Sequence, residues 1–262
     1  MPRLEWGTAG ERFYETGIDR GVLYVGDSPG VPWIGLTAVT ESPTGGGSKP
    51  YYVDGVKYLN TSEREEFEGT ITAFTYPDEF AVCDGYVMTR QGFYTTAQRR
   101  REFNLSYRTR VGNDLSDEAG YKIHLVYNAL ASPTERSNTT IGDSIDPNDF
   151  SWAFTTRPPR IVDRAISAHY VIDSRTTDTG VLTTIEDILY GTEENDARIP
   201  DFMELLAIFD AATELVVVDN GDGTWTATAP FNVIRMIDVG VFEITHTNAE
   251  LVDEDTFTLS SP

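Results

Sequence analysis

The stretch 102–131 constrains the fold most, because it holds two strand-like runs joined by a polar link. In the first run, 103–111, one face carries mainly apolar side chains and the other polar ones: Phe103, Leu105, Tyr107, Thr109 and Val111 alternate with Asn104, Ser106, Arg108 and Arg110. The second run, 121–130, has an apolar face and a mixed one: Tyr121, Ile123, Leu125, Tyr127 and Ala129 alternate with Lys122, His124, Val126, Asn128 and Leu130. A period of two predicts strands. Since the link 112–120 is too long for a tight turn, we expect a β-hairpin with a protruding loop and a mixed face that needs cover.

The composition is that of a globular chain. Its 262 residues are 40% hydrophobic and 11% aromatic, enough for one large β domain or two smaller ones. The single cysteine, Cys83, excludes an internal disulfide framework and a cysteine-rich zinc site. No secretion signal pattern or membrane-spanning apolar run is present in the sequence, so we expect synthesis and folding in a reducing cytoplasm.

The negative charge is unevenly distributed. The formal net charge is −22; residues 1–160 carry 16 Lys and Arg against 22 Asp and Glu, whereas residues 161–262 carry 4 against 20. Tight binding to a phosphate backbone needs clustered cations that displace counterions. The charge therefore argues against a protein that grips nucleic acid, although it does not exclude one that encloses it.

Residues 1–60 are rich in glycine and aromatic residues and show few regular strand patterns, so we expect an arm and a long loop. The aromatic residues are Trp6, Phe13, Tyr14, Tyr24, Trp33, Tyr51, Tyr52 and Tyr58. A neighbouring subunit could bury such side chains. Packing on the chain's own core is an equally good interpretation.

Two further segments of the first part stand out. The stretch 66–76 predicts a strand with Phe67, Ile71 and Ala73 on one face and an acidic, polar face formed by Glu66, Glu68, Thr70 and Thr72. The only concentrated basic region comprises Arg90, Arg99, Arg100, Arg101, Arg108 and Arg110. It is either a solvated strand edge that opposes aggregation or a surface that pairs with acid on another subunit.

The last strand of the first domain is predicted at 150–156, and Pro158-Pro159 marks the boundary between domains 1–160 and 161–262. Beyond it we expect a strand at 169–173. A helix should be capped by Thr183 and Glu186 and end at Gly191, and a second should begin at Pro200. Five short strands should follow, at 215–218, 225–229, 233–237, 241–245 and 256–259. The expected class is mainly β, with an appended α+β domain.

Motifs that could carry chemistry are weak. Gly26-Asp27-Ser28-Pro29-Gly30 has the spacing of a nucleophile elbow, but Pro29 lacks the N–H that the oxyanion hole needs. Gly45-Gly46-Gly47-Ser48-Lys49 lacks the spacing of a phosphate loop, so we interpret it as a flexible loop. Asp219-Asn220-Gly221-Asp222-Gly223 lacks the oxygen ligands of a calcium loop, so we interpret it as a hairpin turn. His124, His169 and His246 are widely spaced and predict no metal site. We therefore expect no catalytic residue, metal or cofactor.

The sequence resembles the major tail proteins, or tail tube proteins, of long-tailed siphophages, particularly those that infect actinobacteria. The likeness covers most of residues 1–160 and extends loosely to Leu189-Tyr190-Gly191 and Ile199-Pro200. It is carried by Trp6-Gly7, by the runs 10–24, 30–33, 35–37 and 49–58, by Glu66-Phe67, Tyr76-Pro77 and 105–108, and by 121–128 and Phe150-Ser151-Trp152. These segments are specific as a set, and no single motif among them is.

The resemblance implies a β-sandwich or partial barrel with a flanking helix, whose subunits form homo-hexameric rings. The rings would stack into the virion tail tube that conducts DNA from capsid to host, after assembly in the host bacterial cytoplasm with tail terminator, tape measure and distal tail proteins. A closed ring of hairpins leaves no free sheet edges. No enzyme activity, cofactor or membrane insertion is implied.

The resemblance also suggests roles for particular side chains. An acidic or neutral wall would let double-stranded DNA slide, so we expect Glu66, Glu68, Thr70 and Thr72 to face the lumen; the alternative is that they face outer solvent or a neighbour. Contacts between subunits are expected from Phe13, Tyr14, Trp33, Tyr51, Tyr52, Arg99, Arg100, Arg101, Arg108 and Arg110. Residues 161–262 would decorate the outside of the tube. Two other classes stay open: a glycan-binding or adhesion β-sandwich, and a hydrolase that uses Ser28 or an acid pair.

Overall fold

The computed structural model describes residues 6–62, 65–138, 140, 147–159 and 167–211, and the backbone of six short strands between 216 and 259. The chain divides into two compact units, one comprising Met1–Thr176 and Glu186–Ile199, the other Thr177–Ile185 and Pro200–Pro262. This division differs from the boundary expected at Pro158-Pro159. The first unit extends to Thr176 because the strand at 169–173 pairs with the central hairpin.

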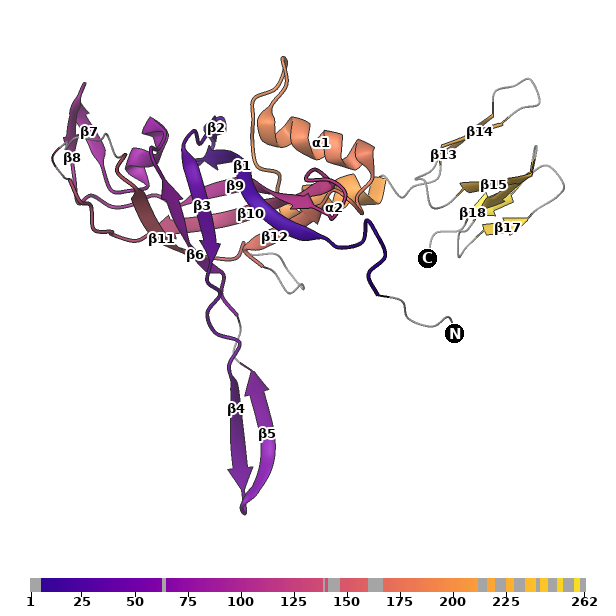
Figure 1. Cartoon of the computed structure of the whole chain (residues 1–262), viewed down its shortest axis with the longest axis horizontal. Coiled ribbons are helices and arrows are strands. Elements are labelled where there is room, and N and C mark those ends of the chain that lie inside the picture. Colours follow the sequence, from indigo (N-terminus) through magenta and orange to yellow (C-terminus); the bar gives the residue numbers. More distant parts are fainter. Residues whose placement is uncertain are drawn as a thin grey trace. The chain divides into compact units, whose positions relative to one another are not determined.

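An eight-stranded antiparallel sheet forms the body of the first unit (Figure 1). Its strands are β1 (Tyr14–Tyr24), β2 (Val31–Pro32), β3 (Leu36–Glu41), β6 (Glu68–Ala73), β9 (Phe103–Gly112), β10 (Gly120–Ala131), β11 (Phe150–Thr156) and β12 (His169–Asp173). The order is β2-β1-β9-β10-β11-β6-β3, and β12 and β11 pair with successive parts of the same edge of β10. The expected mainly β class is confirmed.

The sheet curls, so that strands far apart in the strand order approach each other. β3, the last strand in the order, contacts β1 near the other end. A Cβ atom on Gly21 of β1 would lie 2.6 Å from Cδ2 of Leu36, so glycine is what permits this close approach. The curl closes the inner face into a partial barrel.

Aromatic side chains fill the inside of the curl. The short 3-10 helix η1 (Asp78–Val82) inserts Phe80, whose ring centroid lies 4.7 Å from that of Trp33 and 5.1 Å from that of Trp152. Trp33 Nε1 donates to the Thr75 carbonyl at 2.9 Å, which satisfies its one polar atom. Trp33 is only 3% exposed. The alternative that aromatic residues of 1–60 pack on the chain's own core therefore holds for Trp33, and its expected subunit contact is wrong.

The predicted hairpin is confirmed as β9 and β10, but the faces of β10 exchange within the strand. The register shifts between Val126 and Ala129, where Asn128 has φ 49. This β-bulge adds a residue, so Ala129 and Ala131 join Val126 in the core, while Leu130 turns outward. The expectation that Ala129 continues the face of Ile123 and that Leu130 continues the face of Val126 is wrong for this reason.

Residues 1–60 contain more strand than expected. Besides β1 to β3 they form most of a hairpin of β4 (Ser48–Val53) and β5 (Val56–Ser62). The segment expected to be a long loop is therefore a β-ribbon. A second small hairpin comprises β7 (Val87–Arg90) and β8 (Phe93–Thr95).

Both predicted helices are present with shifted starts. Helix α1 (Thr179–Tyr190) begins one turn before Thr183 because Asp178 Oδ1 accepts from Gly180 N at 2.7 Å; Gly191, at φ +79, ends it as predicted. Helix α2 (Phe202–Ala211) is capped by Asp201, which accepts from Glu204 N at 2.8 Å. No helix within the described ranges is long and apolar enough to cross a membrane.

Three hairpins follow α2. They pair β13 (Val216–Asp219) with β14 (Trp225–Thr228), β15 (Ile234–Asp238) with β16 (Val241–Ile244), and β17 (Ala249–Leu251) with β18 (Phe257–Leu259). The five predicted short strands are confirmed within about one residue, and β17 was not predicted. Residues 220–223 of the rejected calcium loop lie outside the described residues.

Candidate assembly surface

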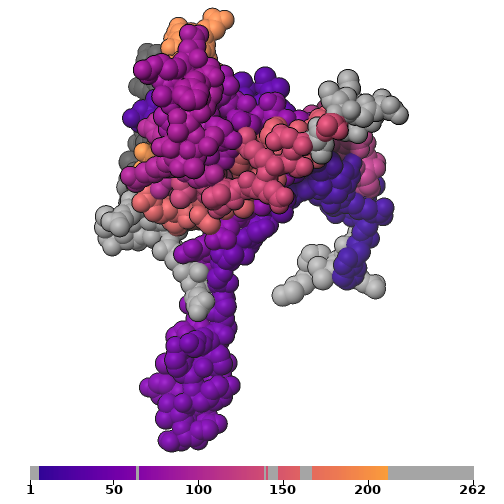
Figure 2. Space-filling view, turned by 90° about the vertical axis from the view of Figure 1, so that its left-hand side faces the viewer, coloured from indigo at the N-terminus to yellow at the C-terminus, as the bar shows by residue number. Residues whose placement is uncertain are grey.

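The hairpin of β4 and β5 gathers exposed apolar side chains within the described part of the first unit. Every residue of both strands is exposed. Six large apolar side chains on it are between 41% and 72% exposed to solvent: Tyr51, Tyr52, Val53, Val56, Tyr58 and Leu59. Figure 2 shows the hairpin, in purple, standing clear of the body of this unit. Large apolar side chains gathered on one exposed element mark an interaction surface.

The hairpin has a defined register but no sheet to support it. Asp54 and Gly55 both have positive φ, 50 and 79, as a two-residue turn of the hairpin type requires. Val53 pairs with Val56 and Tyr51 with Leu59, so these four side chains share one face. An isolated two-stranded hairpin is at best marginally stable in water. Covering this face against another chain would stabilise it.

The expected contact residues at the start of β1 are already partly engaged within the chain. Phe13 is half exposed and lies under the guanidinium of Arg175, 4.7 Å from its ring centroid. Tyr14 donates its hydroxyl to Asp117 in the β9–β10 loop at 2.7 Å. Both side chains keep about half of their surface open to solvent, unlike Trp33.

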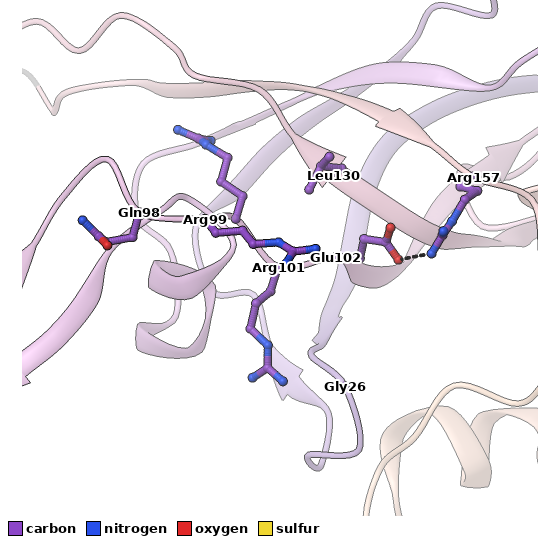
Figure 3. A pocket seen from close by; sticks show the side chains of 8 residues that line it. Gly26, Gln98, Arg99, Arg101, Glu102, Leu130 and Arg157 are labelled. Carbon is purple, nitrogen blue, oxygen red and sulfur yellow. Dashed lines mark hydrogen bonds and ion pairs between the residues drawn. The ribbon is translucent and has the colours of Figure 1, made fainter.

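The arginines expected at subunit contacts separate into two groups. Arg99, Arg100 and Arg101 line a pocket of about 830 Å³ together with Glu102 and Arg157 (Figure 3). Arg100 is held within the chain, by Asp84 at 3.1 Å and by the carbonyl of Ser132 at 3.0 Å. Arg99 and Arg101 are exposed, and within the described ranges no ion pair or side-chain hydrogen bond involves either guanidinium. They leave positive charge available at this pocket.

Arg108 and Arg110 are tied to β1 instead. Arg108 donates to both carboxylate oxygens of Asp19, at 2.7 and 3.0 Å, and Arg110 donates to Asp19 at 2.9 Å. The hydrogen bonds from Arg108 hold the pKa of Asp19 below its usual value. Arg108 is thus a largely buried structural cation, whereas Arg110 keeps half its side chain exposed.

The polar face of β6 is as predicted. Glu68, Thr70 and Thr72 are half-buried and alternate with the buried Gly69, Ile71 and Ala73. Glu66 precedes the strand, in an isolated bridge to Thr44. Cross-strand partners on the same face are small, and none is basic: Ala38 and Thr40 in β3, and Ser151, Ala153 and Thr155 in β11. The three strands therefore present a smooth polar face that lacks cations among these positions.

A cluster that sequence spacing did not reveal lies on the inner face of the curl. His124 Nδ1 of β10 is 3.1 Å from His169 Nε2 of β12, and Glu41 Oε1 of β3 is 3.4 Å from His124 Nδ1. Their wide spacing in the sequence did not indicate that His124 and His169 lie side by side; His246 lies outside the described residues. Burial lowers the pKa of His124 to about 4, with a smaller contribution from His169, and burial lowers that of His169.

No family model and no curated protein matches the chain. Similar solved structures include a chain of the sheath-tube complex of the extracellular contractile injection system PVC, in the extended state (12% identity, TM-score 0.35, 65% of this chain and 94% of that one). The anti-feeding prophage cap, which terminates the tube, is 11% identical (TM-score 0.30, 66% and 96%), and the PVC sheath/tube terminator 16% (TM-score 0.29, 65% and 99%). At these sequence identities and TM-scores, the similarity does not assign a function to this chain.

Proposed function

We propose that this chain is the subunit of a phage tail tube: six copies form a ring, and rings stack into a conduit for DNA. The proposal joins the sequence resemblance to siphophage tail tube proteins with the curled antiparallel sheet of the first unit. In this role the chain is a structural virion protein and not an enzyme, and its partners are copies of itself and other tail proteins.

The observation that carries the proposal is the exposed β4–β5 hairpin. The ribbon holds six large apolar side chains in solvent, and covering them on another subunit would lower the free energy. In a ring or a stack of rings, each hairpin would lie on the neighbouring subunit, and Tyr51 and Tyr52 would contribute the aromatic anchors typical of such interfaces.

The polar face of β11, β6 and β3 suits the wall of a conduit. Duplex DNA carries a dense line of negative charge, and lysine or arginine on the wall would bind it and release counterions. Glu68 with the flanking threonines offers hydroxyls and one acid instead. In this arrangement Glu66, Glu68, Thr70 and Thr72 face the lumen, and DNA slides past them.

Residues 200–262 would decorate the tube, because β12 and residues 186–199 belong to the first unit. The segment 161–262, of which they are the larger part, carries 4 basic residues against 20 acidic ones, which favours solubility and keeps particles apart. Deleting residues 200–262 should leave tube assembly intact; loss of assembly would give them a structural role instead.

Sedimentation velocity of hairpin variants tests the proposal. Replacing Tyr52, Val56 and Tyr58 together by serine should leave the fold intact, since all three are exposed, and should abolish assembly beyond the monomer. The control is Met203→Ser, which removes an exposed apolar side chain on α2, outside the hairpin. Assembly that survives in the triple variant would contradict the role given to the hairpin.

Exposed tyrosines also suit a glycan-binding module, which is the second candidate. Tyr51, Tyr52 and Tyr58 offer aromatic faces on which sugar rings could stack. A stable monomer that binds a specific glycan, and loses binding on the same serine substitutions, would favour this function over tube formation.

A further inference from the structure

Glu41, His124 and His169 come from three different strands and meet on the inner face of the curled sheet. Glu41 pairs with Gly69 in register, on the side of β3 that faces the core. His124 lies opposite Tyr107, and His169 opposite Val126, both of which belong to the core. The curl therefore brings the edge strand β3 over the β10–β12 pair at this one cluster.

The three ligand-type atoms are spaced as a metal ion would require. The distances are 3.1 Å between the two imidazole nitrogens, 3.4 Å from Glu41 Oε1 to His124 Nδ1, and 4.0 Å from Glu41 Oε1 to His169 Nε2. A point equidistant from all three atoms lies about 2.1 Å from each, within the bond lengths that Zn²⁺ makes to histidine nitrogen and carboxylate oxygen.

Surrounding groups hold the ligands in place. His124 Nε2 is 3.0 Å from Thr109 Oγ1, and donation of an N–H to that oxygen leaves Nδ1 with its lone pair toward the cluster. Tyr107 donates its hydroxyl to Glu41 Oε1 at 2.9 Å. The ring of Phe67 stacks on His169 with centroids 4.2 Å apart. Such outer contacts are typical of metal sites, where they fix tautomer and ring orientation.

We propose that Glu41, His124 and His169 bind a divalent transition metal, with zinc as the first candidate. Two imidazoles and one carboxylate are a donor set that suits zinc. Glu41 is about 40% exposed, so it provides an entry path and room for a water ligand, while both histidines are largely buried. The ion would fasten β3 to β10 and β12 and thereby hold the sheet in its curl.

Calorimetric titration of the untagged full-length protein with ZnCl₂, after treatment with EDTA and dialysis, tests the proposal. The expected result is one ion bound per chain, accompanied by a rise in Tm at saturating zinc. Cobalt(II) substituted at the site should give visible absorption bands that report its coordination. Glu41→Gln and His169→Gln should weaken zinc binding by more than the roughly 10- to 100-fold expected for loss of an outer partner. Tyr107→Phe should fall within that smaller range.

His246→Gln is the matched control, because it removes the third histidine of the chain and leaves the cluster intact. It should bind zinc as the wild type does. Glu41→Gln decides the test if His169→Gln fails to fold, since Glu41 is at the surface. No stoichiometric zinc binding by the wild type, or binding unchanged in Glu41→Gln, would overturn the proposal and identify the cluster as a hydrogen-bonded pair of histidines beside a carboxylate.

Discussion

Asp19 in β1 and Arg108 in β9 lie directly opposite each other in register and form a two-pronged ion pair, with Arg108 Nε 2.7 Å from Oδ1 and Nη2 3.0 Å from Oδ2. The pair holds an arginine whose side chain is only 15% exposed. Arg108 also lies 4.5 Å from the ring centroid of Tyr121, on the neighbouring strand β10. The Asp19 carboxylate of β1 therefore holds the Arg108 side chain of β9 beside Tyr121 of β10.

Replacing this carboxylate should destabilise the first unit. Asp19→Asn should lower the free energy of unfolding by about 1–3 kcal/mol, because it removes the carboxylate to which the largely buried Arg108 donates two hydrogen bonds and leaves it, among the described carboxylates, only Glu186, at 3.9 Å. Urea unfolding followed by tryptophan fluorescence measures the loss. Asp27→Asn, which changes an exposed aspartate in the turn after β1, is the control and should have little effect. Equal stability of the two variants would contradict this role of Asp19.

The contribution of Asp19 should also depend on pH. Its pKa in the folded protein is lowered, mainly by the hydrogen bonds from Arg108, so the folded state binds the proton less readily than the unfolded state does. The stabilisation is therefore present in full above the unfolded pKa of about 4 and is lost as the pH falls through the lowered value. The difference in stability between wild type and Asp19→Asn should be constant near neutral pH and should shrink in acid.

The bulge at Asn128 gives a second prediction. Its backbone is left-handed at φ 49; its N–H donates to Asn104 Oδ1 at 2.8 Å, and its side chain donates to the Arg157 carbonyl at 3.0 Å. A β-branched residue is strained there, so Asn128→Val should cost about 1–3 kcal/mol in unfolding free energy, and Asn128→Gly should cost less. Leu130→Val, at an exposed position of the same strand, is the control. Wild-type stability of Asn128→Val would exclude a constrained bulge.

Because the thiol of Cys83 is buried, we expect it to react slowly with disulfide reagents. Burial raises its pKa to about 12, so the thiolate that reacts with disulfide reagents is scarce at pH 8. Labelling with a chromogenic disulfide should be slow in the native protein and fast in urea. Immediate stoichiometric labelling without denaturant would show that the packing around η1 opens readily.

Regular alternation made the centre of the fold predictable. The strands β9, β10, β11 and β12 match the predicted ranges because each has a two-residue period or a short apolar run. The β4–β5 ribbon was not predicted as strands, since its apolar residues show no such period: Tyr51, Tyr52 and Val53 are consecutive, and no core selects one face of them. Burial of these aromatic residues by a neighbouring subunit was one of two interpretations that the sequence left open, and packing on the chain's own core was the other.

The histidine cluster could not be predicted, because its members are far apart in the chain. Glu41, His124 and His169 meet only through the curl of the sheet and the pairing of β12 with β10. The sequence around Asn128 likewise did not predict the β-bulge, although the bulge exchanges the two faces of β10 for the residues that follow it. Trp33 and Arg108 were expected at subunit contacts because large aromatic and cationic side chains favour interfaces. A large aromatic ring also suits the core, where Trp33 lies, and a cation also suits the ion pair with Asp19, where Arg108 lies.

Electron microscopy of the purified protein, concentrated at physiological salt, tests the central claim most directly. We expect hollow tubes or stacked rings with six-fold symmetry, in which the β4–β5 hairpin contacts a neighbouring subunit. Monodisperse monomers at every concentration, even with tail-initiation components added, would contradict a tail tube subunit.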